Sequence, residues 1–379
     1  MLRKIVIAPD SFKGTMSSIE LCNIAEDSIK AVFPDVEVVK IPIADGGEGT
    51  VDAFLAAIGG RRIELAVKGP LFDETAAFYG ILPDGTTAVI EMAAASGLPL
   101  VSDRKDPLRT TTYGTGELIL DALERGCRKI IIGLGGSATN DGGIGMAAAL
   151  GVKFLDAKGD MIPLTGGGIA SLAKIDISGL DRRIRDCEIL AACDVDNPLY
   201  GPNGASAVFG PQKGADPETV AILDSNLSHY ADLLLRDLGT DIAEMSGAGA
   251  AGGLGAGLVA LAGARLMPGI RIILDTVHFD KIIQGADLII TGEGRIDGQS
   301  LRGKVPVGIA EQASRQNIPV IAVVGDVGKD SEQVYARGIT VIFSINRVAL
   351  PLKETRSRSK SDFAATISDI MRLLKSQKL

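Results

Sequence analysis

Residues that build metal sites, disulfides and histidine-based catalytic centres are scarce in this sequence. Its four cysteines are widely spaced at Cys22, Cys127, Cys187 and Cys193, and no two of them form a CxxC pair. Neither a zinc site nor a disulfide framework is therefore expected, and a reducing cytoplasm fits best. The chain has two histidines, and neither stands beside an acid or a cysteine in an arrangement typical of a general base.

Excess positive charge and long hydrophobic runs are also missing. The formal net charge is −8, which argues against a nucleic acid or an anionic membrane as partner, because both are held through basic surfaces. The most apolar internal stretch, residues 248–264, is dense in glycine and shorter than the roughly twenty residues of a membrane span, so we expect a buried helix there. The apolar run at the amino end is short, unlike a signal peptide. We expect a cytoplasmic protein without a membrane or nucleic-acid partner.

Three signatures of common enzyme classes do not occur in the sequence. The chain contains no GxxxxGK[ST] loop and no protein-kinase signature, so any nucleotide is held by a different kind of loop. It also lacks the GxSxG elbow of serine hydrolases, which leaves hydrolase chemistry without support.

Alternating strand and helix patterns are present at both ends of the chain. With 379 residues, of which 46% are hydrophobic and 23% charged, the sequence predicts a compact protein of two domains. Short apolar runs alternate with helical periodicity, and their strands look buried on both faces, as in a parallel sheet. The predicted strands are residues 4–10, 37–45, 287–294, 318–326 and 339–345.

The middle of the chain has a different pattern. Three strand-like runs, 61–70, 74–85 and 86–97, are punctuated by Gly-Pro and Pro-Asp-Gly turn signals, which predict an antiparallel meander. A long amphipathic helix is predicted from Pro217 to about Leu238. This order favours a second domain inserted into the first, although two consecutive domains produce a similar string of elements.

Glycine-rich polar clusters follow several predicted strands, where the ligand crevice of a parallel sheet lies. The segment GLGGSATNDGG (133–143) has the form of a phosphate-binding loop, since glycine lets backbone N–H groups approach a phosphate and a following helix adds a favourable dipole. The alternative is a tight turn that binds nothing. Four further segments with this pattern are APDSFKG (8–14), ADGGEGT (44–50), ACDVDNP (192–198) and TGEGRIDGQS (291–300).

The loop at 133–143 also partly matches a dinucleotide-binding fingerprint. Gly133, Gly135 and Ala138 satisfy GxGxxA after a predicted strand. Asp156 then closes the next strand-like run, at about the spacing of the fingerprint. A single match of this kind is weak, and the inserted NDGG spoils the close helix packing that the last small residue provides. A nicotinamide-dependent hydroxy-acid dehydrogenase stays open as an alternative, beside a non-catalytic sensor of a small acid.

Charged residues at strand ends supply what phosphoryl transfer requires, which is a cation together with carboxylates that bind magnesium or orient the acceptor hydroxyl. Lys13 follows the first strand and can reach a phosphate or a substrate carboxylate, although a surface lysine is a common alternative. Asp10, Asp45 and Asp194 sit at or just beyond strand ends, and helix capping is the alternative for Asp10. Glu293 can bind magnesium or contact nucleotide, and a solvated loop is an equal expectation.

Taken together, these motifs resemble those of the bacterial glycerate kinase family, from about residue 3 to about residue 375. Several of the segments are long and rich in polar residues, so chance similarity does not account for them. The resemblance rests on APDSFKGTMSS, IADGGEGT, EMAAASGLPLV, DPLRTTTYGTGELI, GLGGSATNDGGIGM, ACDVDNPLYGPNGASAVFGPQKGADPE, GAGAAGGLGAGL and DLIITGEGRIDGQSLRGKVPVGIA.

The resemblance implies an α/β fold of two domains and a kinase activity. Both chain ends, 1–67 plus 286–379, would form a flavodoxin-like domain with a parallel sheet, and residues 68–285 an inserted second α/β domain with a mixed sheet. An active site in the cleft between them is expected, with closure excluding water. The implied reaction is ATP-dependent phosphorylation of D-glycerate with Mg²⁺, with 2-phosphoglycerate as the expected product. The main alternative is a kinase for another small hydroxy acid. A homo-oligomer is compatible with both activities.

The resemblance also directs the choice of site residues. Catalysis is assigned to Lys13, Asp45 and Asp194, where Lys13 neutralises charge on the γ-phosphate or on the glycerate carboxylate. One of the two aspartates orients the acceptor hydroxyl and the other holds Mg²⁺, and spacing does not fix which does which. Substrate contacts are predicted from Asp10, Ser11, Ser96 and Thr111. Cofactor contacts are predicted from Gly135, Gly136, Ser137, Asn140, Asp141 and Glu293.

Overall fold

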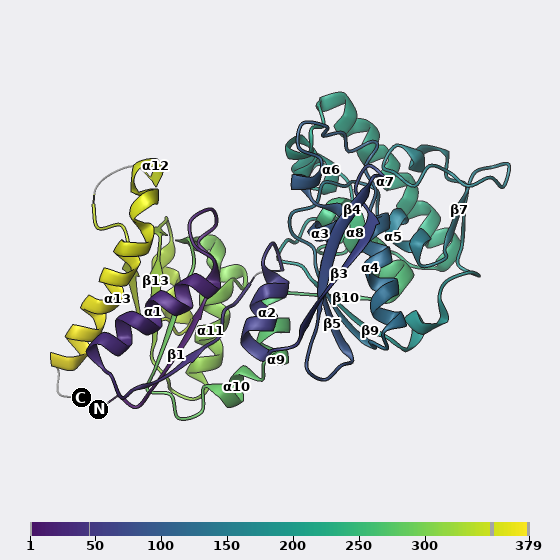
Figure 1. The fold of residues 1–379 in the computed structure, drawn as a ribbon. Coiled ribbons are helices and arrows are strands. Elements are labelled where there is room, and N and C mark those ends of the chain that lie inside the picture. Colours follow the sequence, from purple (N-terminus) through teal and green to yellow (C-terminus); the bar gives the residue numbers. More distant parts are fainter. Residues whose placement is uncertain (1, 45, 349–351, 377–379) are drawn as a thin grey trace. The chain divides into compact units, whose positions relative to one another are not determined.

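The computed structural model describes residues 2–44, 46–348 and 352–376, and the chain divides into two compact units (Figure 1). The first unit comprises residues 1–45, 52–59 and 270–379, and the second comprises residues 46–51 and 60–269. Both ends of the chain therefore belong to one unit. The limits of the two units differ from the predicted domain limits. Residues 60–67 belong to the second unit, and residues 270–285 belong to the first.

A five-stranded parallel sheet forms the centre of the first unit. Its strand order is β15-β13-β11-β1-β2, and every neighbouring pair is parallel. Two strands from the beginning of the chain thus pair with three from its end, in the order of a flavodoxin-like sheet, as the sequence predicts. The strands are β1 (Lys4–Pro9), β2 (Glu37–Lys40), β11 (Leu288–Gly292), β13 (Val320–Val324) and β15 (Val341–Ser344).

Helices from both chain ends cover this sheet. Helices α1 and α13 lie side by side in Figure 1 and pack against each other. The ring of Phe12 meets that of Phe363 edge-on, with 5.9 Å between the ring centroids, in the apolar core beneath them. The helices are α1 (Ser18–Val32), α2 (Thr50–Ile58), α9 (Gly269–Thr276), α10 (Phe279–Ile282), α11 (Val305–Ser314), α12 (Leu352–Thr355) and α13 (Ser359–Ser376).

Helix α1 is capped by Ser17 and not by Asp10. The Ser17 side chain accepts a hydrogen bond from the backbone N–H of Glu20, and the Glu20 carboxylate accepts one from the backbone N–H of Ser17. This reciprocal capping box satisfies two N–H groups that the first helical turn leaves unpaired. Helix capping therefore does not explain Asp10.

A six-stranded mixed sheet forms the centre of the second unit, in the order β10-β9-β6-β5-β4-β3. Strands β3, β4 and β5 are antiparallel neighbours, which confirms the predicted meander, and β5, β6, β9 and β10 run parallel. The strands are β3 (Arg61–Lys68), β4 (Glu74–Ile81), β5 (Thr87–Glu91), β6 (Lys129–Gly133), β9 (Glu188–Ala192) and β10 (Arg265–Met267).

The helices of the second unit include the two that the sequence predicts best. Helix α7 begins after Asp216, whose side chain accepts from the Thr219 N–H, and ends at Gly239 with a left-handed φ of 69°. The predicted buried helix at 248–264 is α8, which is interrupted by non-helical backbone at residues 251–253. The helices are α3 (Ala93–Ser96), α4 (Tyr113–Glu124), α5 (Ile144–Ala149), α6 (Ala205–Phe209), α7 (Pro217–Leu238) and α8 (Ala250–Ala262).

All eight predicted strands are shorter in the structure, and two of them differ most. The run at 37–45 is a strand only to Lys40, and the run at 86–97 leaves the strand after Glu91 and continues as the short helix α3. Among the described residues, no helix is long and apolar enough to cross a membrane.

Candidate active site

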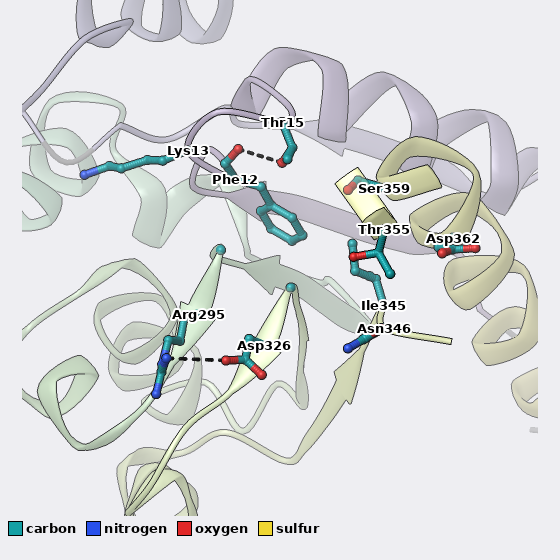
Figure 2. Close-up of a pocket in the computed structure, with 12 residues that line it drawn as sticks. Phe12, Lys13, Thr15, Arg295, Asp326, Ile345, Asn346, Thr355, Ser359 and Asp362 are labelled. Atoms are coloured by element: carbon teal, nitrogen blue, oxygen red, sulfur yellow. Dashed lines mark hydrogen bonds and ion pairs between the residues drawn. The ribbon is translucent and has the colours of Figure 1, made fainter. Parts of the chain in front are cut away.

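The first unit has a pocket of about 320 Å³ where its parallel strands end (Figure 2). Phe12 follows β1, Gly294 follows β11, Gly325 follows β13 and Ile345 follows β15. This is the edge of a parallel sheet at which α/β proteins bind ligands, and the volume lies in the range of small-molecule sites. The pocket is lined by Phe12, Lys13, Thr15, Gly294, Arg295, Gly325, Asp326, Ile345, Asn346, Thr355, Ser359 and Asp362.

A tight loop after β1 carries the predicted residues of APDSFKG. The backbone N–H of Asp10 donates to the Gly292 carbonyl at 2.8 Å, which holds the buried Asp10 at the end of β11. The N–H of Ser11 donates to the Asp10 carboxylate at 2.6 Å. Phe12 and Met16 exchange two backbone hydrogen bonds and so close a turn with Lys13 in it. In Figure 2 the Lys13 side chain extends away from the ring of Phe12.

Glu293 is buried, so the solvated-loop alternative does not hold for its side chain. One carboxylate oxygen accepts from the Ser300 hydroxyl at 2.7 Å, and the other lies 3.8 Å from the Lys304 ammonium. Arg295, two residues further on, forms a 3.5 Å ion pair with Asp326 (Figure 2). Sequence reasoning missed this pair. The available signal was that each of the two charged residues directly follows a glycine at the end of a predicted strand.

Three of the glycine-rich segments meet within the second unit. A Cβ atom at Gly133 would lie 2.3 Å from the Gly46 carbonyl oxygen, and one at Gly135 would lie 2.7 Å from the Gly47 Cα. The Gly135 N–H donates to the Gly46 carbonyl at 3.1 Å. Glycine is therefore required at 133 and 135 so that the segment after Ala44 can approach the loop at 133–143.

The third segment is ACDVDNP, which contains Asp194. Ala192 pairs with Gly133 where β9 and β6 end side by side, so the loops that follow these two strands start next to each other. The Asp194 carboxylate accepts from the Gly269 N–H at 2.9 Å, and its side chain is exposed. Asp45, the other predicted catalytic aspartate, lies outside the described residues.

Ser96 and Thr111 lie beside the loop at 133–143. The Ser96 carbonyl accepts from the Ala138 N–H at 2.9 Å, and its hydroxyl lies 2.9 Å from that of Thr115. Thr111 is fully buried, and its hydroxyl accepts from the Tyr113 N–H at 3.2 Å. The structure thus brings Ser96, Thr111 and the cofactor contacts predicted in the second unit together around one loop.

Asp141 is fully buried and holds the surrounding segments in place. Its carboxylate accepts from the N–H and the hydroxyl of Thr112, both at 2.8 Å, and from the N–H groups of Gly143 and Gly145 at 3.1 Å and 3.2 Å. Burial raises the pKa of Asp141, and these hydrogen bonds oppose the rise. Asn140 beside it donates to the Ser206 hydroxyl at 3.0 Å.

Lys213 is a site candidate that sequence reasoning missed. It ends a short 3₁₀ turn (Pro211–Lys213) and is 2% exposed. Its ammonium donates to the Ser137 hydroxyl oxygen at 2.7 Å and to the Thr139 carbonyl at 2.6 Å. Burial lowers the pKa of Lys213 to about 7, and the charge of Asp141 opposes this. A lysine between glutamine and glycine in GPQKG was the signal available in the sequence.

The dinucleotide alternative loses its structural basis. The fingerprint requires its acidic residue after the next parallel strand of the same sheet. Asp156 instead follows β7 (Lys153–Leu155), which pairs antiparallel with β8 (Lys174–Asp176) in a separate two-stranded sheet. Its carboxylate accepts from the N–H groups of Lys158 and Asp160 in an exposed turn.

Comparisons with known proteins agree with these observations. The model of the glycerate kinase family matches residues 5–375. The chain is 51% identical to the glycerate kinase of Bacillus subtilis (strain 168), over 98% of each chain. It is 52% identical to the glycerate 2-kinase of Escherichia coli (strain K12), over 90% of each chain. A crystal structure from Salmonella typhimurium LT2, described as a glycerate kinase 2, has a TM-score of 0.90 at 48% identity with both chains fully covered.

The family match is not confined to one unit or to one motif. It begins in β1 and ends in α13, and so it includes every glycine-rich segment described above. The chain belongs to the glycerate kinase family.

Proposed function

We propose that this chain transfers the γ-phosphoryl group of ATP to the 2-hydroxyl of D-glycerate, giving ADP and 2-phosphoglycerate. The observation that carries the proposal is the whole-chain match to the glycerate kinase family. The 2-hydroxyl is favoured because a relative with 52% identity over 90% of its length is a glycerate 2-kinase.

Cationic side chains at the edge of the parallel sheet support an anionic ligand there. Lys13 and Arg295 both line the pocket of the first unit. Asp326 and Asp362 line the same pocket and Arg295 pairs with Asp326, so the support comes from the presence of cationic groups at this edge and not from a net positive charge. We assign to Lys13 the neutralisation of charge on the γ-phosphate or on the glycerate carboxylate, with Asp10 and Ser11 as further substrate contacts. Glu293, at the same sheet edge, is assigned to the nucleotide.

The loop at 133–143 is assigned to phosphate binding in the second unit. Gly136 is exposed and has no side chain to cover its backbone, whereas the Gly135 N–H already donates to the Gly46 carbonyl, so a ligand contact of Gly135 would use its other backbone atoms. Ser137, Asn140 and Asp141 supply polar groups around the loop. Ser96 and Thr111 are proposed to contact substrate from the same region. The buried hydrogen bonds of Asp141 support an indirect role in ligand binding, in which Asp141 holds the loop in place for the ligand.

The carboxylates of Asp194 and Asp45 are proposed to orient the acceptor hydroxyl and to hold Mg²⁺. Mg²⁺ bound together with nucleotide phosphates needs only one or two protein carboxylates. The described residues contain no group of three or more His, Cys, Asp or Glu side chains that could hold a metal ion together, and the exposed Asp194 fits this smaller requirement. When bound, the ion would neutralise charge on the transferring phosphate.

The cytoplasm is the proposed location of the reaction, with small molecules as the partners. The four free cysteines support it, and so does the ATP that the proposed reaction needs. The negative net charge gives no support to a nucleic-acid partner. A homo-oligomer is compatible with this assignment.

Substrate-dependent ADP release tests the proposed function. The purified protein is given ATP and Mg²⁺, with no acceptor or with D-glycerate, L-glycerate, glycolate or D-lactate at equal concentration. We expect ADP release that requires D-glycerate and exceeds that with the other acids. A faster reaction with another hydroxy acid would identify a kinase of different specificity, and no release with any acid would contradict a kinase for this class.

Asp194→Asn should lower kcat by about 100-fold or more, because the amide neither binds Mg²⁺ well nor accepts a proton. The amide oxygen can keep the hydrogen bond from the Gly269 N–H, so the fold should be retained. Asp156→Asn is the matched control, since Asp156 lies in an exposed turn. Steady-state kinetics and thermal denaturation of both variants check this, and near-normal turnover of Asp194→Asn would refute the role.

A further inference from the structure

Lys213 is buried, and no carboxylate of the described residues forms an ion pair with it. Among the described residues, the charge that acts on it is that of Asp141, and the two do not form an ion pair. The Asp141 oxygens are instead taken by Thr112, Gly143 and Gly145. A buried lysine without a paired acid lowers stability relative to an apolar side chain of the same length. Its presence at 2% exposure therefore calls for a reason other than stability.

The hydrogen bond between Lys213 and Ser137 fixes the direction of the Ser137 hydroxyl. In its protonated form Lys213 donates three hydrogen bonds and accepts none, so Ser137 Oγ is the acceptor of the 2.7 Å bond as long as Lys213 carries its charge. The hydroxyl proton of Ser137 must then point elsewhere, and it donates to no acceptor among the described residues. Ser137 itself is buried, with 6% of its surface exposed, and it directly follows the exposed Gly136.

The loop around Ser137 is held rigidly on several sides. Lys213 also donates to the Thr139 carbonyl at 2.6 Å, and the Leu98 N–H donates to the Gly136 carbonyl at 2.9 Å. Within the described part of the chain, Thr139 Oγ1 and Asn140 Oδ1 are buried without a hydrogen-bond partner. Such unsatisfied groups are rare in a purely structural loop. Both features fit a segment that is organised for a ligand.

We propose that Lys213 is a positioning residue for phosphoryl transfer, which turns the Ser137 hydroxyl outward as a hydrogen-bond donor to an anionic oxygen of the bound substrate. This inference rests on the proposed function and adds to it a role for the Lys213 ammonium and a role for the Ser137 hydroxyl. The Ser137 hydroxyl is the group that touches substrate, and Lys213 acts through it. A donor fixed in advance needs no reorganisation as negative charge moves during transfer, so it favours the transition state.

A double-mutant cycle on Lys213 and Ser137 tests the proposal. Lys213→Met, Ser137→Ala and the double variant are compared with wild type for kcat and KM with ATP and D-glycerate. Loss of one preorganised donor typically costs about 100-fold in kcat. We expect each single variant to lose kcat to this extent with a smaller change in KM, and the double variant to be no worse than either, because both remove the same donor.

Lys105→Met is the matched control. Lys105 is an exposed lysine whose ammonium donates to the Gln212 carbonyl of the same turn at 3.2 Å. Its kcat and KM should equal those of wild type. Thermal denaturation of all variants separates a folding defect from a positioning role, since a purely structural loss lowers the melting temperature and the active fraction without changing the KM of the remaining enzyme. Ser137→Ala removes a single oxygen and keeps the test valid if Lys213→Met folds poorly.

Three outcomes would overturn the proposal. Normal kcat in a folded Lys213→Met or Ser137→Ala protein would show that the donor is not used. Losses that multiply in the double variant would show that Lys213 does not act through Ser137. In both cases an active wild type leaves the proposed function standing. If the wild type itself transfers no phosphoryl group to glycerate, the proposed function fails and this inference fails with it.

Discussion

Two buried charges, Asp141 and Lys213, differ in how the protein compensates them. The Asp141 carboxylate accepts four hydrogen bonds, three of them from backbone N–H groups. Lys213 donates two hydrogen bonds to neutral oxygens. The protonated lysine is therefore the less well compensated charge, and its pKa falls to about 7. At the residue scale, Lys213 is a lysine whose ionisation changes near neutral pH.

Stability should depend on pH through this group. A pKa lowered from 10.5 to about 7 means that, above pH 7, the unfolded chain binds a proton that the folded chain has released. Stability then rises with pH until the unfolded lysine also titrates. From about pH 7 to about pH 9, the free energy of unfolding of wild type should rise by about 2 kcal/mol relative to Lys213→Met. Well below pH 7 both states hold the proton and no such slope is expected.

Urea denaturation of both proteins at several pH values measures this difference. The other titratable groups linked to Lys213 are Asp141 on the loop, Tyr230 on α7, whose pKa is raised by burial and by the charge of Asp141, and Lys105 beside the same turn. All three are present in both proteins, so their titration largely cancels in the comparison. Parallel pH profiles for wild type and Lys213→Met would show that the Lys213 ammonium stays protonated in the fold.

At the scale of elements, the loop at 133–143 has a packing requirement that is independent of any ligand. Gly135→Ala would place a Cβ 2.7 Å from the Gly47 Cα, a backbone atom that can only move with its segment. We expect a loss of about 1–3 kcal/mol in the free energy of unfolding. Gly294→Ala is the control for stability, because its nearest atoms would lie at 3.7 Å and 3.8 Å. Denaturation without any ligand that leaves Gly135→Ala as stable as wild type would contradict this packing role.

Elements with strong local signals could be predicted from the sequence. Helix α7 has an Asp at its amino end and a Gly at its carboxyl end, and its predicted bounds match the structure. The three-strand meander is marked by turn residues and is also confirmed. The interruption of α8 at residues 251–253 could not be predicted in the same way. There Gly252 lies so close to Thr139 that a Cβ would be 2.0 Å from its carbonyl oxygen, a contact set by tertiary packing.

The same limit applies to the candidate site. The family resemblance assigned Ser96 to substrate and Ser137 and Asp141 to the cofactor, and the structure brings all three to one loop. Lys213 and Arg295 were not found, because an isolated lysine or arginine carries no pattern that distinguishes a buried or pocket-lining side chain from an exposed one. Ser137, the partner of Lys213, lies 76 residues away in the sequence. Asp326, the partner of Arg295, lies in another loop.

At the scale of the whole molecule, the arrangement of the chain explains why the family resemblance extends from end to end. The parallel sheet needs β1 and β2 from the amino end and β11, β13 and β15 from the carboxyl end. The second unit is inserted between them and carries its own mixed sheet and core. Neither unit is complete in one continuous stretch, and the proposed site residues are distributed over both. Loss of either chain end should therefore remove part of the proposed site.

The regiochemistry of the product tests the central claim most directly. The wild-type protein is incubated with ATP, Mg²⁺ and D-glycerate, and the product is examined by phosphorus NMR without proton decoupling. A phosphate on the 2-hydroxyl couples to the single proton on that carbon and gives a doublet, whereas a phosphate on the 3-hydroxyl couples to two protons and gives a triplet. We predict one new phosphomonoester signal, a doublet. A triplet would contradict phosphorylation at the 2-hydroxyl, and the absence of any new phosphomonoester would contradict glycerate phosphorylation itself.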